Sequence, residues 1–137
     1  MKVALDTRIC ISLLNHTSIS ARRRLDEHRP GDVVMSVIVL FELLQGAMKS
    51  ARVAANVANV RDLQRLVPVL RFEEGDAEGA SRIRRHLEGK GRPIGPYDML
   101  IAGQAKARGL VLATNNVKEF GRVEGLAVED WLTGSSL

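Results

Sequence analysis

Three acidic residues, Asp6, Glu42 and Asp98, stand where carboxylates can do chemistry in this chain. Asp6 closes the apolar run Val3-Ala4-Leu5, which predicts a buried strand of a parallel sheet. A carboxylate at the C-terminal end of such a strand lies in the crevice where open α/β sheets bind ligands. Glu42 falls in the first two turns of the helix expected after a second strand, and Asp98 lies near the start of a helix that begins at Pro96. This placement predicts that the three acids come together.

Each acid also has a simpler explanation when it is taken alone. An acid in the first turn of a helix complements the helix dipole, which accounts for Asp98. Asp6 alone is explained as a helix cap, and Glu42 as a solvent-facing residue. Brought together, however, the acids need compensation, because two unit charges roughly 4 Å apart repel by about 4 kcal/mol at an effective dielectric constant of about 20. Shared protons or a divalent cation can reduce this repulsion between the carboxylates. Carboxylates without histidine or cysteine suit Mg²⁺ or Mn²⁺, and such an ion activates water for phosphodiester hydrolysis.

A second group of polar residues follows the third expected strand, in the segment from Thr114 to Phe120. Thr114 and Asn116 are candidate hydrogen-bond donors, and Glu119 is a further acid. An asparagine-rich turn is the alternative explanation for this segment. Because the ends of parallel strands meet at one edge of a sheet, these side chains are expected to complete the site.

The elements that position these residues alternate between strands and helices, which predicts an α/β fold with a parallel sheet. Expected strands cover residues 3–6, 33–35, 110–113 and 126–128, with a short extended element at 69–72. Expected helices cover residues 9–14, 18–27, 36–50, 51–67, 74–87 and 96–109. Residues 1–132 are expected to form one domain, and residues 133–137 a short flexible C-terminal tail.

Composition narrows the class of protein further. The chain has 137 residues, 45% of them hydrophobic and 26% charged, which is ordinary for a globular protein. The net charge of +4 and basic clusters such as Arg22-Arg23-Arg24 favour anionic partners such as nucleic acid, with a solvated helix face as the alternative. Cys10 is the single cysteine, so disulfides and thiolate metal clusters within the chain are excluded, and its apolar neighbours predict a core position. The sequence contains no signal peptide or membrane-spanning run, and we expect a cytoplasmic protein.

Four segments in this order resemble the PIN-domain ribonucleases, specifically the toxin component, VapC, of bacterial VapBC toxin–antitoxin pairs. The resemblance covers nearly the whole chain. It rests on Leu5-Asp6-Thr7-Arg8-Ile9-Cys10-Ile11, on Ser36 through Phe41-Glu42-Leu43-Leu44-Gln45-Gly46, on Ile94-Gly95-Pro96-Tyr97-Asp98-Met99-Leu100-Ile101-Ala102, and on Thr114-Asn115-Asn116 through Glu119-Phe120. The ending Val128-Glu129-Asp130-Trp131-Leu132 is similar too. Each motif is weak alone, and four in order at these spacings are specific.

The resemblance implies a PIN-like three-layer fold, with a central, mainly parallel sheet flanked by helices. It implies an endoribonuclease that depends on Mg²⁺ or Mn²⁺ and inhibits translation. Transfer RNA is the substrate expected for the family, particularly the anticodon stem-loop of the initiator. The implied partners are a VapB-type antitoxin, through which alone operator DNA is bound, and a second copy of the chain in a homodimer and in a higher toxin–antitoxin assembly. No membrane partner is implied. The implied catalytic residues are Asp6, Glu42, Asp98, Asn116 and Glu119, with Asp6, Asp98 and Glu42 as metal ligands and Thr7, Thr114 and Arg8 in support.

Two positions depart from the family pattern. Many relatives carry an aspartate where Asn116 stands, whereas closer ones have an Asn-Asn pair and a glutamate that matches Glu119. The site is therefore expected to hold three core carboxylates, with Glu119 in support. Arg8 stands where close relatives usually carry asparagine. Its guanidinium either pairs with a site carboxylate and competes with the metal, or contacts a substrate phosphate, or points to solvent.

Other functions compete with the ribonuclease. A catalytically weakened PIN domain, acting by antitoxin or nucleic-acid binding, is compatible with Arg8. A phospho-receiver signalling module also places acids at strand ends, but it requires adjacent acids after its first strand, and Thr7 follows Asp6. A phosphatase of the Asp-x-Asp type requires an acid where Arg8 stands. The metal-dependent ribonuclease is the hypothesis that these residues favour.

Overall fold

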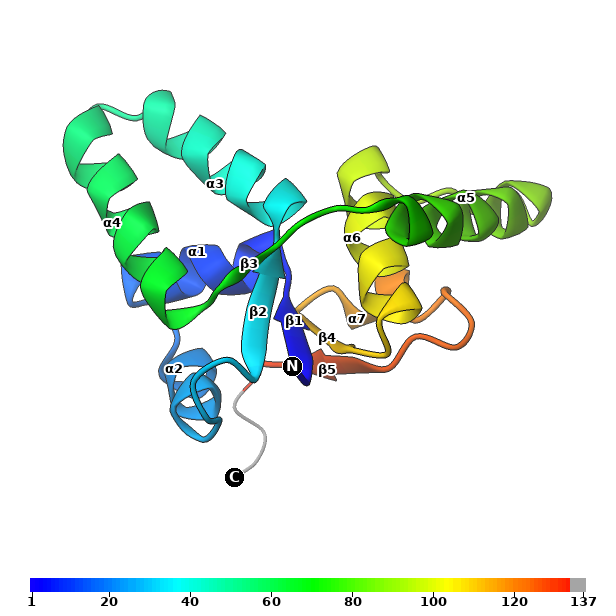
Figure 1. Cartoon of the computed structure of the whole chain (residues 1–137), viewed down its shortest axis with the longest axis horizontal. Helices are drawn as coiled ribbons and strands as arrows, with labels where there is room; N and C mark the ends of the chain where they lie inside the picture. Colours follow the sequence, from blue (N-terminus) through cyan, green and yellow to red (C-terminus); the bar gives the residue numbers. More distant parts are fainter. Residues whose placement is uncertain (134–137) are drawn as a thin grey trace.

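A parallel sheet of five strands, in the order β3-β2-β1-β4-β5, forms the centre of the molecule (Figure 1). The structure is a computed structural model and describes residues 1–133. The strands are β1 (Val3–Leu5), β2 (Val33–Ser36), β3 (Val69–Leu70), β4 (Val111–Thr114) and β5 (Val128–Asp130). The helices are α1 (Thr7–Asn15), α2 (Ile19–Asp26), α3 (Val37–Met48), α4 (Val53–Leu66), α5 (Glu74–Gly89), α6 (Pro96–Ala107) and α7 (Val117–Phe120). The expected α/β class, with a central parallel sheet flanked by helices, is confirmed. Residues 134–137 of the expected tail lie outside the described residues.

The central strand β1 is buried along its whole length. Its register aligns Leu5 with Met35 of β2 on one side and with Ala113 of β4 on the other, and all three residues are fully buried. When helices cover both faces of a parallel sheet, its strands carry nearly continuous apolar runs rather than alternating ones. For that reason even short apolar runs are sufficient to predict β1 and β2.

Two helix pairs stand on either side of the C-terminal edge of the sheet. Figure 1 shows α3 with α4 as one pair and α5 with α6 as the other, with the ends of β1 and β2 between them. Only Asp6 separates β1 from α1, and α3 follows β2 directly, so both helices have their N-termini at this edge. Ser36 caps α3 as expected, because its Oγ accepts a hydrogen bond from the N–H of Ile38 at 3.1 Å. Within residues 1–133, no helix combines the length and the apolar character needed to cross a membrane.

Two elements differ from the expectation. Residues 117–120, expected as part of a turn, form the single-turn helix α7, which is too short to show a helical period in the sequence. Strand β5 spans residues 128–130 rather than 126–128. Its polar residues Glu129 and Asp130 pair with Ala113 and Thr114 of β4. An edge strand accepts such residues because one of its sides has no neighbouring strand, so the apolar run misplaced it by two residues.

Helices α5 and α6 pack with their backbones close together. A Cβ added at Gly103 of α6 would lie 2.6 Å from the backbone of Ala80 in α5, nearer than non-bonded carbon atoms pack. Glycine at position 103 is therefore required by the approach of the two helices, not by its own backbone conformation. The approach ties α5 to α6, the helix that carries Asp98.

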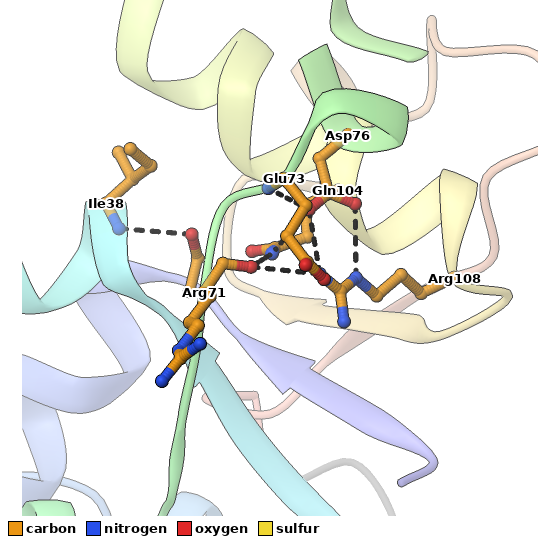
Figure 2. Close-up of polar contacts among 7 residues, drawn as sticks. Ile38, Arg71, Glu73, Asp76, Gln104 and Arg108 are labelled. Atoms are coloured by element: carbon orange, nitrogen blue, oxygen red, sulfur yellow. Dashed lines mark hydrogen bonds and ion pairs between the residues drawn. The ribbon is translucent and has the colours of Figure 1, made fainter. Parts of the chain in front are cut away.

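A buried carboxylate also joins the start of α5 to the end of α6 (Figure 2). Asp76 is 2% exposed, and its oxygens accept hydrogen bonds from Nε and Nη2 of Arg108 at 3.1 and 2.9 Å. Gln104 Nε2 donates to it at 3.0 Å, and the N–H of Glu73 at 2.8 Å. Arg108 and Gln104 also donate to the carbonyl oxygen of Arg71, at 2.9 and 2.7 Å. We call these five residues the Asp76 network: Arg71, Glu73, Asp76, Gln104 and Arg108. The network fixes the connection between β3 and α5 against the last turn of α6.

Candidate active site

The end of β1 is the point where the chain changes direction across the sheet. From β1 the chain passes to β2 and β3 on one side, and it later returns to β4 and β5 on the other. The crevice at such a switch point is where open α/β sheets bind ligands. Asp6 stands there, as expected, and its N–H donates to the carbonyl oxygen of Ala113 in β4 at 3.0 Å. The backbone of Asp6 is therefore fixed between β1 and β4.

The Asp6 side chain is buried, with 4% of its surface exposed. Its Oδ1 accepts a hydrogen bond from the N–H of Ile9 at 3.0 Å, so Asp6 does cap α1. Burial raises the pKa of Asp6 above its ordinary value. Hydrogen bonds from Thr114 and Ile9, and the positive charge of Arg8, oppose that rise. Asp6 is held firmly, and its ionised form carries a cost that a nearby cation would offset.

Glu42 reaches the same edge from α3. The hydroxyl of Thr7 donates to Oε1 of Glu42 at 2.6 Å, which links α1 to α3. Phe41 on one side of Glu42 is exposed and Leu43 on the other is buried, so Glu42 lies at the edge of a buried face, as expected. Thr7, expected only as a supporting residue, has a definite partner and fixes one oxygen of this carboxylate.

The pKa of Asp98 indicates that other acids lie near it. It is partly exposed, in the first turn of α6. Burial is the main cause that raises the pKa of Asp98 to about 6. Negative charges raise it further, and these belong to Glu119, Asp6 and Glu42. The positive charge of Arg8 acts in the opposite direction. Three acids from three other segments of the chain are thus close enough to Asp98 to repel its negative charge.

The last residue of β4, Thr114, and the segment after it complete the site. Thr114 is fully buried, and its Oγ1 accepts a hydrogen bond from the N–H of Asn116 at 2.9 Å. Asn116 Nδ2 donates to Oε2 of Glu119 at 2.9 Å, so this expected donor and this expected acid are brought together. Sequence reasoning missed Asn115, whose Oδ1 is buried and has no hydrogen-bond partner among the described residues. The Asn115-Asn116 pair was the sequence signal that could have indicated it, because both amides follow the end of a strand and both are candidate site residues.

Arg8 is exposed in the first turn of α1. Its positive charge lowers the pKa values of Asp6 and Asp98, so the guanidinium lies on the side of the acids. Among residues 1–133, however, it forms no ion pair with a carboxylate. Of the three roles expected for Arg8, direct pairing with a site carboxylate is therefore not the one adopted here.

The donors at this edge fit a hard divalent cation. They are carboxylates without histidine or thiolate, and a cation would offset both the burial and the neighbouring negative charges that raise the pKa of Asp98. In the described part of the chain, the side chains form no group of three aspartate, glutamate, histidine or cysteine residues close enough together to bind one metal ion. Mg²⁺ usually keeps several waters and is bound by one or two carboxylates. Such an ion would therefore not need three direct ligands.

Cys10 is excluded as a nucleophile. It is fully buried in α1, which confirms the expected core position. Burial, with a further contribution from the negative charge of Asp6, raises the pKa of the Cys10 thiol far above its ordinary value. Because the thiolate is the reactive form, a thiol that stays protonated at neutral pH is inert.

Replacing Asp98 with asparagine is expected to stabilise the metal-free protein at neutral pH. The folded pKa of about 6 lies above the ordinary value of 3.8. The stability that this group contributes is therefore fully present below about pH 4 and is lost as the pH rises through about 6. Asparagine stays neutral at every pH. The gain at neutral pH should be about 1–2 kcal/mol, allowing for solvent screening of this partly exposed group.

Urea unfolding of the wild type and of Asp98→Asn in EDTA, at about pH 4 and again at about pH 7.5, measures this gain. The two proteins should be equally stable in acid and should diverge at the higher pH. Adding a divalent cation at neutral pH should then stabilise the wild type more than the variant. Equal stability at both pH values would mean that the pKa of Asp98 is not raised in the folded protein.

Comparisons with known proteins point to one family. The family model of the PIN domain matches residues 3–126. The tRNA(fMet)-specific endonuclease VapC of Shigella flexneri is 40% identical to the chain over 131 residues, which cover 96% of this chain and 98% of that protein. Among solved structures, DNA-bound VapBC from Salmonella typhimurium matches with a TM-score of 0.91 at 39% identity, over 96% of this chain and 98% of that one. VapBC2 from Rickettsia felis, bound to a promoter DNA fragment, matches with a TM-score of 0.88 at 32% identity, over 96% and 99% of the two chains.

Proposed function

Because the chain belongs to the VapC ribonucleases of the PIN-domain family, we propose that it is the toxin of a toxin–antitoxin pair and hydrolyses phosphodiester bonds of RNA. The observation that carries this proposal is the cluster of acids at the switch point of the sheet, which are Asp6, Glu42, Asp98 and Glu119. An acid cluster without histidine or thiolate suits metal-assisted attack of water on a phosphate.

Asp6 and Asp98 would hold a Mg²⁺ or Mn²⁺ ion directly, and Glu42 would complete its shell or orient the attacking water. When bound, the ion would polarise a phosphoryl oxygen and lower the pKa of a bound water. Three of the four acids have a polar neighbour that holds them: Thr7 for Glu42, Thr114 for Asp6 and Asn116 for Glu119. Such neighbours typically change metal affinity or activity about 10–100-fold when they are removed.

Transfer RNA is the substrate we propose, because two relatives, one 40% and one 39% identical, are named tRNA(fMet)-specific endonucleases. The protein would then act in the cytoplasm, where tRNA is found. Basic residues of α5 and of the loop after it are candidates for contacts with the RNA backbone, and these are Arg82, Arg85, Lys90 and Arg92.

Incubation of the purified protein with total tRNA and Mg²⁺ or Mn²⁺ tests the proposed function. We expect cleavage of few tRNA species, no cleavage in EDTA, and single new 5′ ends when the products are sequenced. Binding of tRNA without cleavage, in the presence of either ion, would instead support a catalytically weakened PIN domain.

A VapB-type antitoxin is the protein partner that we propose, since the matching solved structures are VapBC complexes. A groove of about 260 Å³ between α1, α3 and α4, lined by apolar and polar side chains, suits an amphipathic segment of such a partner. Ile11, Leu14 and Val60 line it, and so does Glu42. An antitoxin seated there would reach the acids and block them. Operator DNA would be bound through the antitoxin, and the homodimer stays a prediction.

Arg8 is expected to bind a substrate phosphate, because it is exposed beside the acids and forms no ion pair among the described residues. Replacing it with asparagine should raise KM for RNA about tenfold, the cost of one charged hydrogen bond, and change kcat little. Arg23→Asn is a matched control, because Arg23 is also exposed but lies on α2. Faster cleavage and tighter metal binding by Arg8→Asn would show that Arg8 competes with the metal.

A further inference from the structure

Two aromatic rings meet on the surface beside the acids. Phe41 of α3 and Tyr97 of α6 pack edge to face, with ring centroids 5.5 Å apart and planes at 61°. Despite this contact, Phe41 is 47% exposed and Tyr97 is 44% exposed. An edge-to-face pair leaves at least one face of each ring clear of the other. The pair therefore offers flat apolar surface to solvent.

The position of this pair is not explained by the core. Of the other phenylalanine and tryptophan side chains, Phe120 and Trp131 are fully buried and Phe72 is partly buried. Phe41 and Tyr97 instead come from two helices that belong to different helix pairs, and they touch at the edge of the sheet where the acids gather. Each ring is the sequence neighbour of an acid, Phe41 of Glu42 and Tyr97 of Asp98. Because consecutive Cα atoms are about 3.8 Å apart, the backbone position of each ring adjoins that of a site acid.

A site built from acids has difficulty in attracting RNA. The carboxylates repel the phosphate backbone, and one divalent ion neutralises only part of their charge. Stacking of a base on an aromatic ring is attractive without any charge, and every base has a face that can stack. Bases inside a helix are already stacked on their neighbours, so only unpaired bases are available.

We propose that Phe41 and Tyr97 together form a stacking site for an unpaired base of the RNA substrate, next to the acids. This inference rests on the proposed ribonuclease function and adds the form of RNA that the site accepts. The scissile bond would lie in a loop or a single strand, near the stacked nucleotide. A second copy of the chain is the competing occupant, because Val37 and Met48 of α3 are also exposed. That helix face alone, however, would not require Tyr97 of α6 to join it.

The test uses a single-stranded RNA oligonucleotide that carries 2-aminopurine at one position near the cleavage site, mixed with the purified protein in EDTA so that no cleavage occurs. Stacking quenches the fluorescence of 2-aminopurine. Phe41→Leu and Tyr97→Leu keep an apolar side chain but remove the flat face, and each should weaken binding about tenfold and reduce the quenching. Tyr97→Phe should bind as the wild type does. Met48→Ala is the matched control, since Met48 is 61% exposed at the far end of α3.

The same oligonucleotide as a perfect duplex should bind the wild type weakly and show no protein-dependent quenching. Unchanged affinity and quenching in the Phe41→Leu/Tyr97→Leu variant would overturn the proposal. A change of that variant from dimer to monomer in sedimentation, with quenching retained, would overturn it in favour of an interface between copies.

If RNA is cleaved with a metal present but the wild type quenches 2-aminopurine at no position, the stacking site fails and the ribonuclease stands. If the wild type quenches but never cleaves, the stacking site stands and the ribonuclease fails.

Discussion

The Asp6→Asn variant should lose RNA cleavage by at least about a thousandfold and still fold. A metal ligand contributes several kcal/mol of transition-state stabilisation, and every 1.4 kcal/mol or so is a factor of ten in rate. Asparagine removes the charge of Asp6 but keeps an oxygen that can accept from the N–H of Ile9, so α1 retains its cap. It also removes the cost of burying an ionised group. Single-turnover cleavage of tRNA, with a thermal melt of the same sample, measures both effects.

Two companion variants sharpen this result. Asp98→Ala should lose cleavage to a similar extent and should still bind the antitoxin. Asp26→Asn removes the same charge from an exposed position on α2 and should cleave at the wild-type rate. Cleavage by both Asp6→Asn and Asp98→Ala at the wild-type rate, under identical metal conditions, would show that the acids are not the catalytic centre.

The sheet was predictable because burial leaves a simple mark on the sequence. A parallel strand covered on both faces is an apolar run with a sharp polar end, and Val3-Ala4-Leu5 followed by Asp6 shows that mark. Strand β5 lacks it, since two of its three residues are Glu129 and Asp130. Helix α7 lacks it for another reason, because four residues do not complete a helical period.

The meeting of Asp6 and Asp98 was predictable from their places at element ends, because topology alone brings such ends to one edge of a parallel sheet. The same logic does not say which oxygen contacts which donor. The bond from Thr7 to Glu42 depends on how α1 and α3 cross, and the sequence carries no local signal for it. The contact between Phe41 and Tyr97 likewise joins helices that are far apart in the sequence. Local patterns therefore predict the site but not its internal geometry.

The Asp76 network is the clearest feature that sequence reasoning could not find. Asp76 alone is an ordinary acid in the first turn of a helix, and Arg108 an ordinary base after the end of another. Their meeting requires the close approach of α5 and α6 that Gly103 allows. An isolated glycine in a helical pattern only weakens the helix prediction, so its role appears once its neighbour across the interface is known.

Replacing Arg108 with methionine should lower the free energy of unfolding by about 3 kcal/mol, the lower end of the cost of breaking a buried pair, because Arg108 itself is partly exposed. Methionine keeps much of the side-chain volume but removes the guanidinium that donates to both oxygens of the Asp76 carboxylate. Burial works to raise the pKa of Asp76, but hydrogen bonds from Arg108, the backbone of Glu73 and Gln104 together keep it below the ordinary value. A lowered carboxyl pKa gives stability that is present above about pH 4 and is lost as the pH falls through the folded pKa.

The difference between the wild type and Arg108→Met should therefore shrink in acid, and urea unfolding at several pH values measures it. Arg84→Met is the matched control, because its ion pair with Glu88 on α5 is exposed and should contribute less than about 1 kcal/mol. Asp76→Asn/Arg108→Met should be more stable than Arg108→Met alone, since no unpaired charge remains buried. A double variant that is less stable than either single variant would mean that the residues stabilise the helices independently. Below its melting temperature, Arg108→Met should still cleave RNA, which separates the network that supports α6 from the acids that do the chemistry.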